Sequence, residues 1–182
     1  MDADTAWLAD HLAVALRERG RAVARVSWRG FWRARSLRLE HGRHDPDSYY
    51  ESWTDVSGLR REVLDPMRPG AAWTWVPSLW DAERDRATRA PRIQAAPGTV
   101  VVLDGPFLLR PELADALDAV VHLQTSDAAV RRRLAEADRA PDAEQVLGAW
   151  HRYLSEARPA DTAAAVLRFE DPRHPALVLR GR

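Results

Sequence analysis

The chain has 182 residues, of which 46% are apolar and 30% charged, and its acidic and basic residues balance to zero net charge. This composition suits one α/β domain over residues 1–182, and it gives no general attraction for nucleic acid or an anionic membrane. The absence of cysteine excludes disulfides, thiolate catalysis and cysteine-ligated zinc. The acidic N-terminal segment lacks a signal-peptide pattern and no apolar run could span a bilayer, so we expect a cytoplasmic protein.

All 27 basic residues are arginine, so the chain contains no lysine. Mechanisms that need a lysine amine are therefore excluded, among them Schiff-base formation and the phosphate-binding lysine of a P-loop. The chain also has eight tryptophans, several of them clustered in the sequence. Such clusters predict either ordinary core and loop packing or an aromatic wall around a ligand.

The first part of the chain predicts a helix followed by a strand. Residues 4–19 are expected to be helical, with Asp4 or Thr5 as the N-cap and Gly20 as the stop. Residues 21–28 alternate between apolar and polar side chains, which indicates a strand. A helix followed by a strand is typical of an α/β unit.

The middle of the chain has a weaker pattern. Residues 31–55 show no sustained period, and an irregular segment of that length is usually functional or mobile. Ser57 is expected to cap a short helix over residues 58–67. The tryptophan- and arginine-rich residues 71–97 are expected to form a hairpin or loop packed over a sheet.

The segment TVVVLDGPFLLR, residues 99–110, begins with a run that is apolar on both faces. Such a run is typical of a buried strand in a parallel sheet covered by helices on both faces. Ligands in such sheets collect at the carboxyl ends of the strands, where Asp104 lies. The remaining expected elements are a helix from Pro111, a strand over 119–123, helices capped by Ser126 and Asp142, and strands over 165–169 and 176–179.

Five motifs then occur in a fixed order: Trp53-x-Asp55, LRREVLDPMRPG at 59–70, VPSLWDAERDRATRAP at 76–91, VVLDGPFLLRPEL at 101–113, and VHLQTS at 121–126 with the arginine-bearing helix after it. In this order the chain resembles the uridine kinase-like branch of the P-loop nucleoside kinases over nearly its whole length. The resemblance implies a P-loop NTPase-like α/β fold. It also implies a nucleoside held between the Trp53 motif and the 76–91 segment, facing the phosphates of ATP.

The phosphate loop of that family is not matched here. Its Gly-Lys-Ser/Thr positions fall on Asp4, Thr5 and Ala6, and an acid there repels phosphate at a helix N-terminus. We therefore expect the usual first strand and phosphate loop to be missing or rebuilt. Three arrangements would accommodate the missing central strand: the strand at Val100 pairs with the strand at Val120, another segment fills the place, or the natural chain starts upstream.

The acceptor side of the resemblance also departs from the family. Two acids that follow the second strand are replaced by Arg29 and Gly30, and an arginine cannot act as a general base. Asp104 matches the magnesium-binding acid of the family, although a purely structural role in the turn is an equal alternative. Asp55 matches the acid that contacts the sugar.

The candidate catalytic residues are Asp104, Asp55 and His44. The candidate substrate-binding residues are Trp28, Trp32, Tyr49, Tyr50, Trp53, Trp80, Asp81, Arg84, Asp85 and Arg132, the last from the base of an arginine lid. For these residues the plain alternative is packing and solvated charge. No metal-ligand set is predicted.

Three functions remain open from the sequence. The first is a kinase-derived protein that has lost ATP-dependent phosphoryl transfer and binds or transforms a nucleoside-like molecule or secondary metabolite, with ATP-independent acid/base chemistry of the isomerase, lyase or cyclase type if it is catalytic. The second is an active nucleoside kinase that holds phosphate with arginines, and only this one needs ATP and magnesium. The third is a non-catalytic regulatory or partner-binding module. We expect a small-molecule ligand and no cofactor, and a homodimer is possible.

Overall fold

The structure is a computed structural model that describes residues 2–137, 142–171 and 173–178. The chain forms two compact units, each treated separately below. The N-terminal unit comprises residues 2–40 and 52–106, and the C-terminal unit comprises residues 41–51 and 107–182.

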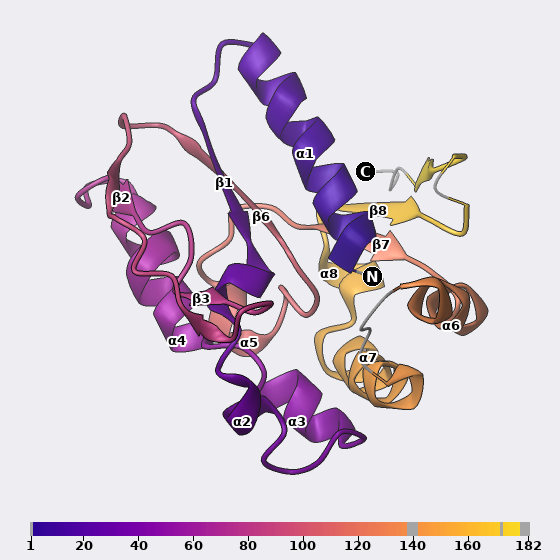
Figure 1. Cartoon of the computed structure of the whole chain (residues 1–182). Helices are drawn as coiled ribbons and strands as arrows, with labels where there is room; N and C mark the ends of the chain where they lie inside the picture. The colour runs from indigo at the N-terminus through magenta and orange to yellow at the C-terminus, as the bar shows by residue number, and fades with distance from the viewer. Residues whose placement is uncertain (1, 138–141, 172, 179–182) are drawn as a thin grey trace. The chain divides into compact units, whose positions relative to one another are not determined.

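The N-terminal unit is built on a parallel pair of strands. Its elements are α1 (Asp2–Glu18), β1 (Val23–Ser27), the 3₁₀ turn η1 (Trp28–Phe31), α2 (Arg35–Arg38), α4 (Val56–Leu59), the π-helical turn η2 (Arg60–Leu64), the 3₁₀ turn η3 (Asp65–Met67), β2 (Thr74–Trp75), β3 (Trp80–Asp81), β4 (Arg86–Ala87), β5 (Ile93–Gln94) and β6 (Val100–Asp104). Strands β1 and β6 pair in register from Val23 with Val100 to Ser27 with Asp104. Helix α1 packs against both strands, as Figure 1 shows.

Helix α1 starts two residues earlier than the capping pattern predicts. It runs from Asp2 to Glu18, so Asp4 lies within the first turn and is not the N-cap. The predicted stop is confirmed, because the helix ends just before Gly20, whose φ of +75° suits glycine.

The segment expected to be irregular contains the short helix α2 and the short helix α3 (Pro46–Glu51). The predicted cap at Ser57 is wrong. Asp55 caps α4, since its carboxylate accepts a hydrogen bond from the Gly58 amide at 2.9 Å, and Ser57 lies inside the helix. Both residue types are good caps, and the helix begins two residues earlier than the pattern predicts.

Of the hairpin or loop expected over residues 71–97, the structure shows the hairpin. It consists of two short antiparallel ladders, with β2 paired to β5 and β3 paired to β4. The hairpin returns the chain to β6.

The C-terminal unit contains α3, α5 (Pro111–Ala114), β7 (Val121–Gln124), α6 (Asp127–Glu136), α7 (Ala143–Ala157), α8 (Pro159–Thr162), β8 (Ala165–Arg168) and β9 (Ala176–Val178). Strand β7 pairs with β8 in parallel, and β8 pairs with β9 in antiparallel register. The predicted caps are confirmed, because Ser126 accepts from the Ala129 amide and Asp142 accepts from two amides of α7.

The core of the C-terminal unit is aromatic. The Phe107 ring lies 5.0 to 5.8 Å, between centroids, from the rings of Tyr49, Tyr50 and Tyr153. Helices α3 and α7 pack against each other, and Gly148 of α7 leaves the room that the Pro46 ring occupies. The two tyrosines of α3 are thereby held in the core of this unit.

The expected α/β fold class is confirmed, because the structure combines helices with short pairs of parallel strands. Strand β6 pairs with β1 and strand β7 pairs with β8. Among residues 2–137, 142–171 and 173–178, every helix is too short or too polar to cross a bilayer.

Candidate functional site

Asp104 lies at the carboxyl end of β6, as the sequence predicts, and its side chain is buried. Arg25 of the neighbouring strand donates a hydrogen bond to Oδ1 of Asp104 and forms an ion pair with it. The Ser27 hydroxyl donates to Oδ2 at 3.4 Å. Burial raises the pKa of the Asp104 carboxyl, and the hydrogen bond from Arg25 opposes that rise.

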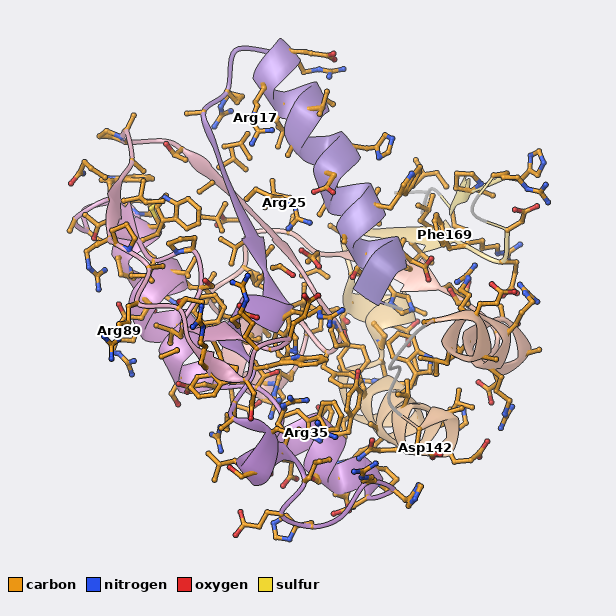
Figure 2. All side chains as sticks on the ribbon, in the orientation of Figure 1. Arg17, Arg25, Arg35, Arg89, Asp142 and Phe169 are labelled. Carbon is orange, nitrogen blue, oxygen red and sulfur yellow. The ribbon has the colours of Figure 1, made fainter. Side chains whose placement is uncertain are left out.

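Arg25 also connects Asp104 to helix α1. Its Nε lies 2.8 Å from an Asp10 carboxylate oxygen, and its Nη2 donates to the Ala6 carbonyl at 3.4 Å. Figure 2 shows the side chain between α1 and the strand pair. The Arg25 guanidinium is therefore the cation that pairs with the Asp104 carboxylate, and the same guanidinium binds residues of α1.

Trp28 covers the corner that follows Asp104. Only 3% of Trp28 is exposed, and a Cβ atom built at Gly105 would lie 2.7 Å from its Cγ. Residue 105 therefore has to be glycine for this ring to close over the corner. Trp28 therefore packs against the backbone at Gly105. This agrees with the packing role, which was the alternative to the predicted contact with a ligand.

The next two residues replace the acids of the kinase resemblance in different ways. The Arg29 guanidinium is exposed and lies 4.9 Å from the centre of the Trp32 ring. At Gly30, an added Cβ would lie 2.8 Å from the Ser78 Cβ, and the Leu79 amide donates to the Gly30 carbonyl at 2.7 Å. The hairpin thus occupies the space that a carboxylate side chain at residue 30 would need.

Trp32 and Trp53 form an aromatic pair with a buried arginine. Their ring centroids are 5.4 Å apart in an edge-to-face arrangement, and Trp32 bridges to Thr54 through the backbone. The Arg38 guanidinium carbon lies 4.9 Å from the Trp32 centroid and 5.0 Å from the Trp53 centroid. Burial lowers the pKa of Arg38. Sequence reasoning did not identify Arg38, although Arg29, Trp32, Arg35 and Arg38 recur at every third residue.

The side chain of Asp55 has a structural role, because it caps α4. One carboxylate oxygen accepts from the Gly58 amide at the start of α4, and the other lies against the place where a Gly58 side chain would project. The acid that the resemblance assigns to sugar contact therefore caps a helix here.

The Asp81 carboxylate binds the loop that carries it, and the Asp85 carboxylate binds the start of α2 and the Trp80 side chain. The Asp81 carboxylate accepts from the Arg84 amide at 3.0 Å, and such backbone hydrogen bonds lower its pKa. The Arg84 side chain lies 3.5 Å from the same carboxylate. Asp85 accepts from the Arg35 amide at 2.8 Å and from the Trp80 indole at 3.1 Å. Trp80 stays half-buried, so its ring is partly available to a ligand.

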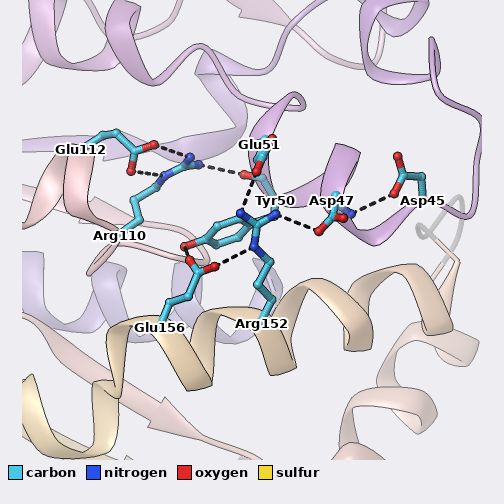
Figure 3. Close-up of polar contacts among 8 residues, drawn as sticks. All are labelled: Asp45, Asp47, Tyr50, Glu51, Arg110, Glu112, Arg152 and Glu156. Carbon is cyan, nitrogen blue, oxygen red and sulfur yellow. Dashed lines mark hydrogen bonds and ion pairs between the residues drawn. The ribbon is translucent and has the colours of Figure 1, made fainter.

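Tyr50 lies in the C-terminal unit, between two arginines (Figure 3). The guanidinium carbons of Arg110 and Arg152 lie 4.8 and 4.7 Å from its ring centroid, and its hydroxyl donates to Glu156 at 3.1 Å. Burial and Glu156 together raise the pKa of Tyr50 to about 12. Arg152 is ion-paired with the carboxylates of Asp47, Glu51 and Glu156. Tyr50 therefore joins α3 to α7.

The remaining candidates also belong to the C-terminal unit. Tyr49 is buried against Phe107. The side chain of His44 is 78% exposed, with its Nδ1 3.5 Å from a carboxylate oxygen of Asp142. Arg132 is exposed and donates to a backbone carbonyl at 3.5 Å. The structure thus gathers Asp104, Asp55, Trp28, Trp32, Trp53, Trp80, Asp81, Arg84 and Asp85 in the N-terminal unit, and His44, Tyr49, Tyr50 and Arg132 in the C-terminal unit.

In the described part of the chain, no group of three or more histidine, aspartate or glutamate side chains is arranged to hold a metal ion.

Comparisons with known proteins bear on the fold. No protein-family model matches the chain, and no curated protein matches it. Solved structures do match. A possible uridine kinase from Bacillus stearothermophilus superposes with a TM-score of 0.70 at 22% identity, over 87% of this chain and 79% of that one. A protein assigned as a fructose transport system kinase from Silicibacter sp. TM1040 gives 0.52 at 24% identity, over 86% and 78% of the two chains. The YGR205w protein gives 0.54 at 12% identity, over 97% and 85%. The chain therefore has the α/β fold of the uridine kinase-like P-loop kinases.

Proposed function

We propose that this chain is a kinase-derived protein that does not transfer phosphate from ATP and instead binds a small molecule, nucleoside-like or a secondary metabolite. The observation that carries the proposal is the ion pair between Arg25 and Asp104. Asp104 is the one acid that matches the magnesium-binding carboxylate of the kinase resemblance, and an arginine of the same chain already neutralises it.

The residues present do not fit ATP and magnesium. The first turn of α1 carries Asp4 where the resemblance places a phosphate-binding glycine, and a carboxylate there opposes the attraction of a helix N-terminus for phosphate. Magnesium is held in kinases through carboxylates and substrate phosphates, and a carboxylate paired with a guanidinium is a poor ligand for it.

The acceptor side lacks a general base as well. Arg29 is a cation that cannot accept a proton, and residue 30 has no room for a carboxylate beside Ser78. The hairpin packs against Gly30 in the space that the side chain of an acid would fill. This packing supports the proposal that the chain no longer uses the two acids of the kinase resemblance.

The ligand-binding half of the proposal rests on Trp80 and its neighbours. The half-buried Trp80 ring and the exposed acid Asp85 lie together on the hairpin, joined by a hydrogen bond of 3.1 Å. An aromatic face beside a carboxylate suits a flat heteroaromatic ligand with hydrogen-bond donors.

The test is a phosphoryl-transfer assay with Mg-ATP and a panel of ribonucleosides and deoxyribonucleosides, in which ADP is measured for the wild type and for Asp104→Asn. We expect both proteins to match the protein-free background. ADP formation that requires a nucleoside and disappears in Asp104→Asn would refute the loss of kinase chemistry.

A further inference from the structure

Two arginines of the N-terminal unit contact the Trp32 ring, and a third, Arg35, lies between them in the sequence. We define the Trp32 cluster as Arg29, Trp32, Arg35, Arg38, Trp53 and Asp85. Arg29 and Arg38 each place the guanidinium carbon 4.9 Å from the Trp32 ring centre. Arg35 and Asp85 are joined through the Arg35 backbone amide, at 2.8 Å.

Arg38 contributes a charge that water screens poorly. It is only 7% exposed, between the rings of Trp32 and Trp53, and its Nε donates to the Arg33 carbonyl at 3.0 Å. Burial lowers the pKa of Arg38 most, Arg35 and Arg29 lower it further, and Asp85 acts to raise it, so each of these three charges lies within electrostatic reach of Arg38.

The exposed members of the cluster keep their donors available. In the described part of the chain, the guanidinium groups of Arg29 and Arg35 have no hydrogen-bond or ion-pair partner, although Arg29 contacts the Trp32 ring. Each presents a planar set of donors that matches the oxygens of a phosphate. The cluster thus combines a buried cation with two accessible ones.

The net positive charge of the cluster indicates which class of anionic ligand it would bind. Three arginines and one aspartate leave an excess of two positive charges. A phosphate monoester carries about −1.5 to −2 charges at neutral pH, whereas a carboxylate carries one. We propose that the Trp32 cluster binds the phosphate group of a small phosphate monoester. This inference rests on the proposed function, since it assigns a chemical class to the ligand.

The experiment is a calorimetric titration with methyl phosphate, in the absence of ATP and magnesium and at constant ionic strength. Acetate is titrated in parallel. The variants are Arg29→Gln and Arg35→Gln, each of which removes the guanidinium and its charge from an exposed side chain. Arg19→Gln is the matched control, because it removes the same charge from an exposed arginine of the same unit, at the residue that directly follows α1. Far-UV circular dichroism checks that every variant is folded.

We expect saturable binding of methyl phosphate to the wild type and to Arg19→Gln. In Arg29→Gln and Arg35→Gln the affinity should fall about tenfold, the loss of one charge-assisted contact. Acetate should bind at least tenfold more weakly than methyl phosphate. The inference is overturned if methyl phosphate gives no saturable heat, if the two variants bind it as tightly as Arg19→Gln, or if acetate binds equally well. None of these outcomes depends on ADP formation, so the inference and the proposed function fail separately.

Discussion

The guanidinium of Arg25 on β1 is ion-paired with the buried carboxylate of Asp104 at the end of β6, where the two strands lie in register. The same guanidinium reaches Asp10 and the Ala6 carbonyl of α1. One cation therefore ties the helix to both parallel strands, at the sheet edge where related folds bind ligands.

Replacing Asp104 with asparagine should destabilise the protein by roughly 3 kcal/mol, because the variant leaves the charge of Arg25 partly buried without its carboxylate. Urea unfolding of the wild type, Asp104→Asn, Arg25→Met and the double variant gives the coupling energy between the two residues. The double variant should recover part of the stability lost in Asp104→Asn. Strictly additive losses would show that the pair is not coupled.

An acid restored at residue 30 should not fit. Gly30→Asp should lower the free energy of unfolding by about 1–3 kcal/mol, since its Cβ would lie 2.8 Å from that of Ser78. The matched control is Arg29→Asp at the neighbouring exposed position, which should change stability far less. Equal stability of the two variants would contradict the close packing of the hairpin against residue 30.

Acidification should weaken the C-terminal unit through His122, a buried residue stacked on Trp150 with ring centroids 5.6 Å apart. Burial lowers the pKa of His122 to about 4, so the unfolded chain takes up the proton first as the pH falls. The stabilising effect of the neutral ring is complete above pH 6.5 and should be lost between pH 6.5 and about 4, by up to about 3 kcal/mol.

Denaturant unfolding at several pH values, compared with His122→Leu, isolates this effect. The raised pKa of Asp104 acts with the opposite sign, and it is present in both proteins. The variant should show a flatter dependence on pH over this window. Identical slopes would mean that His122 does not titrate differently in the folded and unfolded chains.

Tyr50 should matter for stability. Tyr50→Phe removes the hydroxyl that donates to Glu156 and should cost about 1 kcal/mol, whereas Tyr50→Leu also loses the ring between Arg110 and Arg152 and should cost more. Thermal unfolding measures both variants. If Tyr50→Leu leaves the melting temperature unchanged, the ring between the two arginines does not stabilise the α3–α7 contact.

Sequence reasoning located the strands and several caps because their signals are local. The apolar run before Asp104 and the acid before α7 each determine their own structure within a few residues. The sequence predicts Ser57 as the cap of α4 and the structure has Asp55, since either residue can cap a helix.

The contacts that define the site are not local, and this limits what one sequence can show. Arg25 and Asp104 are 79 residues apart, and only the parallel register of β1 and β6 brings them together. Similarly, the steric contact of Gly30 with Ser78 depends on how the hairpin folds back. The roles of Asp55, Asp81 and Asp85 in holding loops likewise depend on backbone amides whose directions a sequence does not reveal.

Magnesium binding tests most directly whether Arg25 holds Asp104 in place of a metal ion. Magnesium chloride is titrated calorimetrically into the wild type and into Asp104→Asn, at constant ionic strength and without nucleotide. We expect no saturable heat from either protein at millimolar magnesium. Saturable binding to the wild type that is lost in Asp104→Asn would show instead that Asp104 binds a metal ion.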